Sequence, residues 1–141
     1  DIEGKPFVGR AGKLLDKMLE SIQLDRTKVY ISNVVNYRPP ANRAPSEAEI
    51  KRYLPYLKNH IEIISPKILV LLGKTALNTL IGNENVISKA RGKWIQKEIG
   101  ALKTWVIASF HPAFLMRQPE QKKFAWIDLK MIRDKSKNLK I

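Results

Sequence analysis

Apolar residues recur along this chain with two different periods. Over residues 9–23 they are spaced three or four positions apart, which is typical of an amphipathic helix. Residues 46–64 show the same spacing and predict a second helix, which Pro55 should kink or split in two. A final helix is expected over residues 119–137, with Ile127 among the residues on its inward face.

Three shorter segments are almost continuously apolar and rich in β-branched residues, as buried strands are. They are residues 29–35, 68–73 and 104–109. A short helix over residues 74–82 is expected after the second of these strands, and residues 83–104 should form a loop with a small hairpin. Because helices separate the strands, the pattern favours parallel pairing, with helices covering both faces of the sheet.

The length of 141 residues suits one domain, spanning residues 1–141, with a single core. No apolar run approaches the length that spans a bilayer, so we expect no membrane association. The opening residues lack the basic and apolar regions of a signal peptide, and without an initiator methionine we expect an N-terminal truncation. The absence of cysteine excludes disulfides and thiolate metal sites and fits a reducing cytosol.

Charge is the first indication of function. The 26 Lys and Arg residues exceed the 13 Asp and Glu residues, which gives a formal net charge of +13. Such a surplus favours polyanionic partners, either nucleic acid or an acidic membrane surface. A solvated, lysine-rich surface would have the same composition, so charge alone leaves these alternatives open.

Polar and aromatic groups gather where the predicted strands end, and open α/β sheets bind ligands beyond the carboxyl ends of their strands. Asn33 lies in the first strand, Lys74 follows the second, and His111 follows the third and precedes a proline. A glycine-rich segment near the N-terminus presents Phe7. An aromatic ring, an amide and an imidazole beside basic loops would suit a nucleobase attached to a polyanion.

Five motifs in this chain resemble those of family 4 uracil-DNA glycosylases. In chain order they are GKPFVGRAGKLL (4–15), NVVNYRPPANRAP (33–45), LGKTAL (72–77), ARGKW (90–94) and HPAFLMR (111–117). The first two are specific signals, whereas the last would be weak alone because His-Pro pairs are common. The resemblance covers almost the whole chain. It implies a three-layer α/β/α fold with a central, mostly parallel four-stranded sheet, whose first strand we expect to be missing here.

The resemblance implies a base-excision repair enzyme that flips uracil out of DNA and hydrolyses its N-glycosidic bond. Phe7 would stack on the uracil face, and Asn33 would read the O4 acceptor and N3–H donor of its edge. His111 would donate a hydrogen bond to O2 as negative charge builds on the leaving base. Taken singly, Phe7 would suit a core, Asn33 a turn or cap, and His111 a structural hydrogen bond.

The same resemblance suggests contacts with DNA. Phe114, Leu115 and Met116 would supply an apolar wedge that fills the gap left by the flipped base. Basic and polar residues in loops would contact phosphates, which position the protein rather than specify a sequence. These residues are Arg38, Asn42, Arg43, Lys74, Arg91, Lys93 and Arg117.

The chain departs from the family in two ways. The family's first motif, a GEAPG-type loop implicated in handling water, would precede Asp1. Typical members also hold an iron–sulfur cluster on four cysteines, two of them upstream, and the other two positions align here with Tyr37 and Tyr53. Without a thiolate in the chain, we expect no iron–sulfur cluster and no metal.

Three functions therefore stay open at the level of sequence. The first is a uracil-DNA glycosylase that acts as a monomer on uracil-containing DNA in a bacterial cytosol or nucleoid. The second is a catalytically silent DNA-binding module of the same fold. The third is a glycosylase for another damaged base.

Overall fold

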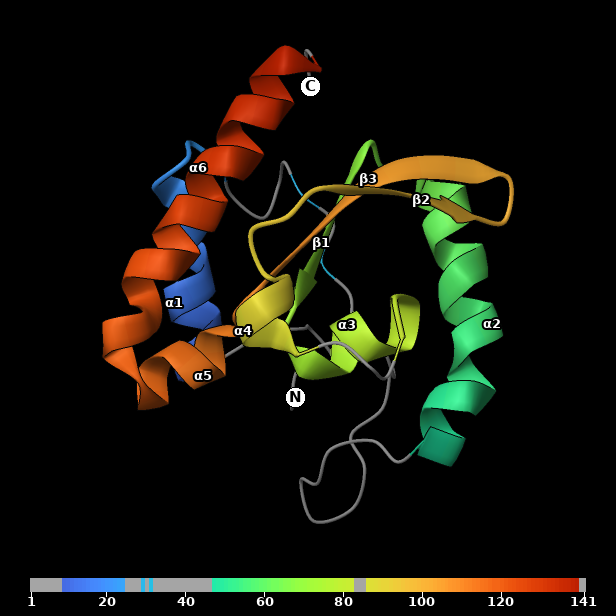
Figure 1. Ribbon diagram of the computed structural model, residues 1–141, viewed down its shortest axis with the longest axis horizontal. Coiled ribbons are helices and arrows are strands. Elements are labelled where there is room, and N and C mark those ends of the chain that lie inside the picture. Colours follow the sequence, from blue (N-terminus) through green and yellow to red (C-terminus); the bar gives the residue numbers. More distant parts are fainter. Residues whose placement is uncertain (1–8, 25–28, 30, 32–46, 83–85, 140–141) are drawn as a thin grey trace.

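The structure is a computed structural model that describes residues 9–24, 29, 31, 47–82 and 86–139 (Figure 1). Most of these residues belong to helices and strands. In chain order they are α1 (Gly9–Glu20), α2 (Glu47–Ile64), β1 (Ile68–Leu72), α3 (Lys74–Leu80), α4 (Ile87–Ala90), β2 (Ile95–Ile99), β3 (Leu102–Ser109), α5 (Pro112–Arg117), the 3₁₀ turn η2 (Pro119–Gln121) and α6 (Lys122–Asn138).

Helices α1, α2, α3 and α6 lie where the sequence predicts helices, whereas α4 falls in the expected loop. Pro55 lies inside α2. We expected this proline to kink or split the second helix, and it does not split it, because α2 is one helix of 18 residues with Pro55 inside it. Proline has no N–H, so the carbonyl of Lys51, four residues earlier, loses its usual partner. Both residues are exposed, and water can satisfy that carbonyl, so the helix tolerates the proline.

The described strands form one mixed sheet in the order β1-β3-β2. Strand β1 pairs with β3 in parallel, from Ile68 opposite Trp105 to Leu72 opposite Ser109. Strands β2 and β3 form a hairpin and pair antiparallel, so the third predicted strand is one arm of the hairpin and not a separate strand after it. The expected strand at 29–35 lies almost entirely outside the described residues. The α/β class is confirmed, and β3 occupies the centre of the described sheet.

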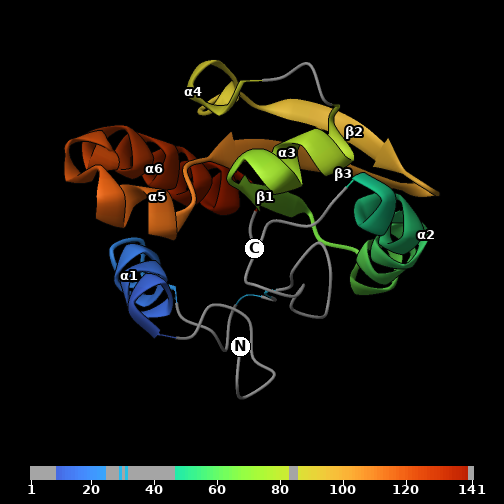
Figure 2. The same ribbon diagram turned by 90° about the horizontal axis from the view of Figure 1, so that it is seen from below.

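Helices cover both faces of this sheet, with α1, α5 and α6 on one side and α2 and α3 on the other (Figures 1 and 2). The alternation of β3 supplies both cores, since successive side chains of a strand point to opposite faces. The first core contains Met18, Ile22, Ile107, Phe110, Leu115, Ala125, Leu129 and Ile132. The second contains Ile61, Leu71, Leu77, Leu80, Ile99, Val106 and Ala108.

Parallel pairing brings the carboxyl ends of β1 and β3 to the same edge of the sheet. The two strands end together, because Leu72 is the register partner of Ser109. The pairing continues one step further, where the N–H of Gly73 donates to the carbonyl of Ser109 at 2.9 Å. The segments that follow, which begin α3 and α5, therefore start side by side. No helix in the described segments is long and apolar enough to cross a membrane.

Candidate active site

His111 lies where β3 ends, and its imidazole caps the first turn of α5. Its Nδ1 accepts a hydrogen bond from the N–H of Ala113 at 3.0 Å. Pro112 occupies the first helical position, where its missing N–H costs nothing, so Ala113 is the first residue whose N–H needs a partner. Because Nδ1 is an acceptor, the neutral ring carries its proton on Nε2. The local sequence thus selects the tautomer that donates from Nε2.

Burial of the ring lowers the pKa of His111 below its ordinary value, and the positive charge of Arg117 lowers it further. A charged imidazole would also lose the hydrogen bond between Nδ1 and Ala113, since both ring nitrogens would then be donors. At neutral pH His111 is consequently a neutral donor rather than an imidazolium. A neutral histidine held in this way can stabilise a negative charge that develops during a reaction.

Gly73 lies directly against this imidazole. A methyl group built on its Cα would lie 3.0 Å from Cβ of His111 and 3.6 Å from Cγ and Cδ2. Its φ of 94° also falls in a region that residues with a side chain rarely adopt. The end of β1 therefore supports the histidine at the end of β3, and a residue without a side chain is required for this contact.

A buried carboxylate ties the end of β3 to two other segments. Asp128 of α6 has no exposed surface, and its Oδ2 accepts from the hydroxyl of Ser109 at 2.6 Å. Arg91 donates to the same carboxylate through Nε at 3.0 Å and a terminal nitrogen at 2.6 Å. This bidentate bond raises the pKa of Arg91. The carboxylate thus has three donors, as a buried charge requires.

The turn after Arg91 is fitted closely to this carboxylate. Gly92 has a φ of 72°, and a methyl group at its Cα would lie 2.7 Å from Oδ1 of Asp128. Its N–H donates to the carbonyl of Ala108 in β3 at 3.1 Å. The Arg-Gly pair of the fourth motif therefore holds the strand end that carries His111. Sequence reasoning missed Asp128, although an acidic residue between Ala125 and Leu129 on an apolar helix face was a signal.

The expected DNA contacts fall into different environments. Lys74, Lys93 and Arg117 are exposed. Lys74 is the first residue of α3 and Arg117 is the last residue of α5, the two short helices that follow the strand ends. The guanidinium of Arg91, by contrast, is bound to Asp128 and lies 5.2 Å from the ring centre of Phe124. A phosphate contact by Arg91 stays a prediction, and its established partner is a carboxylate of the protein.

The expectation for Leu115 is wrong in this structure. Its side chain is 0% exposed and belongs to the core between β3, α1 and α6, so it cannot act as a surface wedge. The neighbouring Met116 is 38% exposed and is the large apolar residue that α5 presents to solvent. Helical geometry separates the two, because consecutive residues of a helix point in different directions.

The remaining expected site residues lie outside the described residues. They are Phe7, Asn33, Tyr37, Arg38, Asn42 and Arg43. The convergence of Phe7 and Asn33 on His111 therefore stays a prediction.

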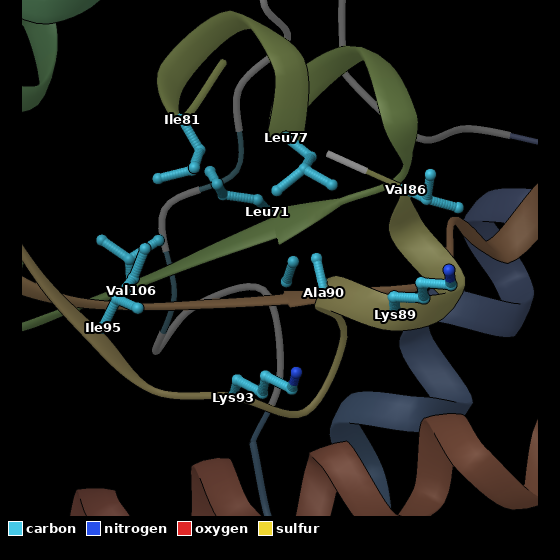
Figure 3. Close-up of a pocket in the computed structure, with 10 residues that line it drawn as sticks. Leu71, Leu77, Ile81, Val86, Lys89, Ala90, Lys93, Ile95 and Val106 are labelled. Carbon is cyan, nitrogen blue, oxygen red and sulfur yellow. The ribbon is translucent and has the colours of Figure 1, made fainter. Parts of the chain in front are cut away.

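A cavity of about 440 Å³ lies between α3, α4 and the strands (Figure 3). Leu71, Leu77 and Ile81 gather beneath α3 on one side of it, and Lys89 and Lys93 come from the other side. Neither Gly73 nor His111 lines this cavity. Its lining is mostly apolar and offers no group that would activate a bond, so we place the candidate chemistry at the strand ends instead.

A mixed sheet with helices on both faces, and a neutral histidine at the end of its central strand, defines an α/β protein with a strand-end site. The family model of the uracil-DNA glycosylase superfamily matches residues 1–130. The chain belongs to this superfamily, and the resemblance seen in the motifs is confirmed.

Among curated proteins, the chain is similar to type-4 uracil-DNA glycosylases. It is 43% identical to that of Sulfurisphaera tokodaii, over 95% of this chain and 63% of the relative. The Archaeoglobus fulgidus protein is 40% identical, over 94% of this chain and 68% of the relative. The Thermotoga maritima protein is 45% identical, over 83% of this chain and 60% of the relative. The chain thus spans about two thirds of the length of these relatives.

The residues present do not fit the iron–sulfur cluster of the family. The sequence contains no cysteine, and Tyr53, at one of the aligned cysteine positions, is a half-buried residue of α2. Its ring lies 6.4 Å from that of Tyr56, measured between centroids. No group of three or more potential metal ligands occurs within the described segments. We therefore derive no step of the chemistry through a cluster.

Proposed function

We propose that this protein excises uracil from DNA by hydrolysing the N-glycosidic bond. The observation that carries the proposal is the state of His111, a neutral imidazole whose Nδ1 is engaged by Ala113 and whose Nε2 bears the proton. The family membership and the activity for which the relatives are named support the same reaction.

In this reaction the bond between C1′ of the deoxyribose and N1 of uracil breaks, and its electron pair leaves with the base. Water then supplies a hydroxyl to C1′ and a proton to the base. Negative charge accumulates on the uracil oxygens as the bond lengthens, and His111 donates from Nε2 to O2. This hydrogen bond strengthens only as the charge develops. It therefore stabilises the transition state more than the bound substrate and lowers the barrier. A donor of this kind accounts for a factor of about 10²–10³ in rate.

Phe7 and Asn33 complete the proposed pocket. Extruding a base costs a few kcal/mol, and stacking on Phe7 would return about 1–3 kcal/mol of it. The carboxamide of Asn33 would donate to O4 and accept from N3–H. Cytosine presents the reversed pattern and would leave buried polar groups without partners, which makes the pocket selective for uracil.

The positive charge supports the proposed DNA partner. Lys74, Lys93 and Arg117 are exposed, and each would contact a phosphate. Of the three residues expected to supply the apolar wedge, Met116 is the one that α5 exposes, and we assign the wedge to it. We propose that the protein does this work as a monomer, since the sequence itself supplies every group of the proposed site. We also propose that it works in the cytosol, because a chain without cysteine suits a reducing compartment.

The test is uracil release from a synthetic oligonucleotide under single-turnover conditions, with the full-length protein. We expect His111→Ala to lower the rate about 100-fold. His60→Ala, which changes the other histidine of the chain, is the matched control and should release uracil at the wild-type rate. No release by the wild-type protein, or equal rates for both variants and wild type, would contradict the proposal.

The same assay addresses the two alternatives. Oligonucleotides that carry other deaminated or oxidised bases in place of uracil test the range of bases. Faster release of one of these would assign the protein to another damaged base. Binding of uracil-containing DNA without release of any base would favour the silent binding module.

A further inference from the structure

A second surface of the protein lies where α1 meets α5 and α6, and it includes basic residues to which no role has been given. It is a groove of about 230 Å³ between α1, α5 and the start of α6. Both views place α1 beside α5 and α6 (Figures 1 and 2). We call it the α1 groove, and its lining residues are Arg10, Lys13, Leu14, Lys17, Met116 and Lys122.

The core holds this groove in shape. Met18 and Ile22 follow the lining residues along the chain, and both are buried against Leu115 of α5. Arg10, Lys13 and Lys17 are spaced three and four residues apart, so they lie along one side of α1. The walls of the groove are therefore helices packed on the main core, and its cations are presented from a rigid support.

The charges of the groove lack acidic partners among the described residues. The ion pairs of those residues are Arg91 with Asp128 and Arg133 with Asp134, and neither includes a lining residue. Four cations in so small a space repel one another, and a bound polyanion would relieve this repulsion. The groove is thus electrostatically prepared for a ligand with several negative charges.

The distance between the groove and His111 suits one polyanion, the DNA strand that carries the excised base. Met116 lies five residues after His111, a rise of about 7.5 Å if the helix is regular. One strand of DNA advances about 3.4 Å per nucleotide, so this separation corresponds to about two nucleotides. A strand whose base reaches His111 would therefore bring a neighbouring phosphate to the groove.

We propose that the α1 groove binds the phosphodiester backbone of the DNA strand that carries the excised base, about two nucleotides from that base. Arg10, Lys13, Lys17 and Lys122 contact successive phosphates, and the apolar Leu14 contacts the deoxyribose between them. The position relative to the excised base rests on the proposed function. The binding of DNA by the groove does not, because it needs no chemistry.

The test compares two triple variants with the same change in net charge. The groove variant is Lys13→Gln, Lys17→Gln, Lys122→Gln. The control variant is Lys51→Gln, Lys58→Gln, Lys103→Gln, whose three lysines are exposed on α2 and β3. Affinity for a uracil-free single-stranded oligonucleotide is measured by fluorescence anisotropy over a range of salt concentrations. Circular dichroism and thermal melting verify that both variants are folded.

We expect the groove variant to bind at least tenfold more weakly at low salt. Its plot of log Kd against log salt should be shallower by about two, since each phosphate contact to a single strand contributes about 0.7. The control variant should stay within about threefold of wild type. Equal slopes and affinities for the two variants would overturn the proposal. This holds even if only the groove variant loses affinity for polyglutamate. Such a result would indicate that the groove binds an acidic protein segment instead of DNA.

A second measurement tests the position along the strand. Uncharged methylphosphonates replace single phosphates of a uracil-containing oligonucleotide, one position at a time. For wild type, we expect the largest loss of affinity one to three nucleotides from uracil, and the groove variant should show no further loss there. An identical pattern in wild type and groove variant would overturn the placement. Failure of uracil release would contradict the proposed function and leave the salt measurement intact.

Discussion

Gly73 and His111 touch across the ends of two parallel strands, and a methyl group on Gly73 would lie only 3.0 Å from Cβ of the histidine. The contact exists because Leu72 and Ser109 are register partners, so the next residues of both strands emerge at the same edge. Nδ1 of the same imidazole is held by Ala113. The ring is thus fixed from two sides, and its proposed role depends on both.

Gly73→Ala should impair excision more than it impairs folding. The methyl group must displace His111, and the φ of 94° becomes strained, at a cost of about 1–3 kcal/mol in unfolding free energy. We expect the single-turnover rate to fall at least tenfold, with the loss measured at saturating protein. Lys58→Gly in the exposed interior of α2 is the control, because glycine there costs about 1 kcal/mol on the face of the sheet opposite to α5. A similar rate loss in both variants would show that stability alone is responsible.

Acid should destabilise the protein through His111. Its pKa is lowered by burial and by Arg117, so the unfolded chain binds the proton first as the pH falls. The stability that comes from the neutral ring is present above the ordinary pKa of about 6.5 and is lost as the pH falls from there toward the lowered value. Urea unfolding at pH 7 and pH 5 measures this loss.

Two substitutions make that measurement specific. His111→Asn keeps a side-chain acceptor that suits a helix N-cap and removes the titrating group, so its stability should fall less between pH 7 and pH 5. Arg117→Gln removes the positive charge that helps to lower the pKa of His111, so its stability should also fall less than that of the wild type. The same pH dependence in His111→Asn and wild type would show that His111 does not carry the effect.

Removing the charge of Asp128 should destabilise the protein strongly. In Asp128→Ala the hydroxyl of Ser109 and the guanidinium of Arg91 both lose their acceptor. Breaking a buried pair in this way costs about 3–5 kcal/mol, and the partial exposure of Arg91 places the expected loss near the lower end. Chemical denaturation measures the loss.

The chain contains a matched exposed pair for comparison. Asp134 lies 3.2 Å from Arg133 on the surface of α6, so Asp134→Ala should change the unfolding free energy by less than about 1 kcal/mol. Comparable losses for the two aspartates would contradict the structural role that we assign to Asp128.

Substitutions of Leu115 and Met116 should have different effects, one on stability and the other on uracil release. Leu115→Ala removes a fully buried side chain and should cost about 2–5 kcal/mol in unfolding free energy. Met116→Ala should leave stability nearly unchanged and slow uracil release from double-stranded DNA more than from single-stranded DNA, because only a duplex must be kept open. Equal effects of Met116→Ala on the two substrates would remove it from the wedge role.

Much of the fold was predictable because local patterns determine it. The periods of the apolar residues placed α1, α2 and α6, and the continuous apolar runs placed β1 and most of β3. The capping of α5 by a histidine before a proline is also local, since all its partners lie within a few residues. The end of the third predicted strand and this cap coincide at His111, so the local sequence is enough to single out that residue.

The interior of α6 shows where such reasoning fails. We expected Ile127 to face inward, but it is 50% exposed, whereas the adjacent Asp128 is completely buried. A carboxylate is buried only if donors surround it, and here they come from Ser109 and Arg91, 19 and 37 residues away along the chain. No window of neighbouring residues contains that information.

By itself the sequence determined the helices and the strand ends, the tautomer of a histidine held by its own neighbours, the positive charge and the family motifs. Each of these depends on contacts over a few residues or on composition alone. The tertiary structure decided that Asp128 and Leu115 are buried, that Met116 is exposed, that Gly73 supports His111 and that basic residues of α1 face Lys122. These depend on which distant segments pack together, because burial and charge pairing are properties of neighbours in space.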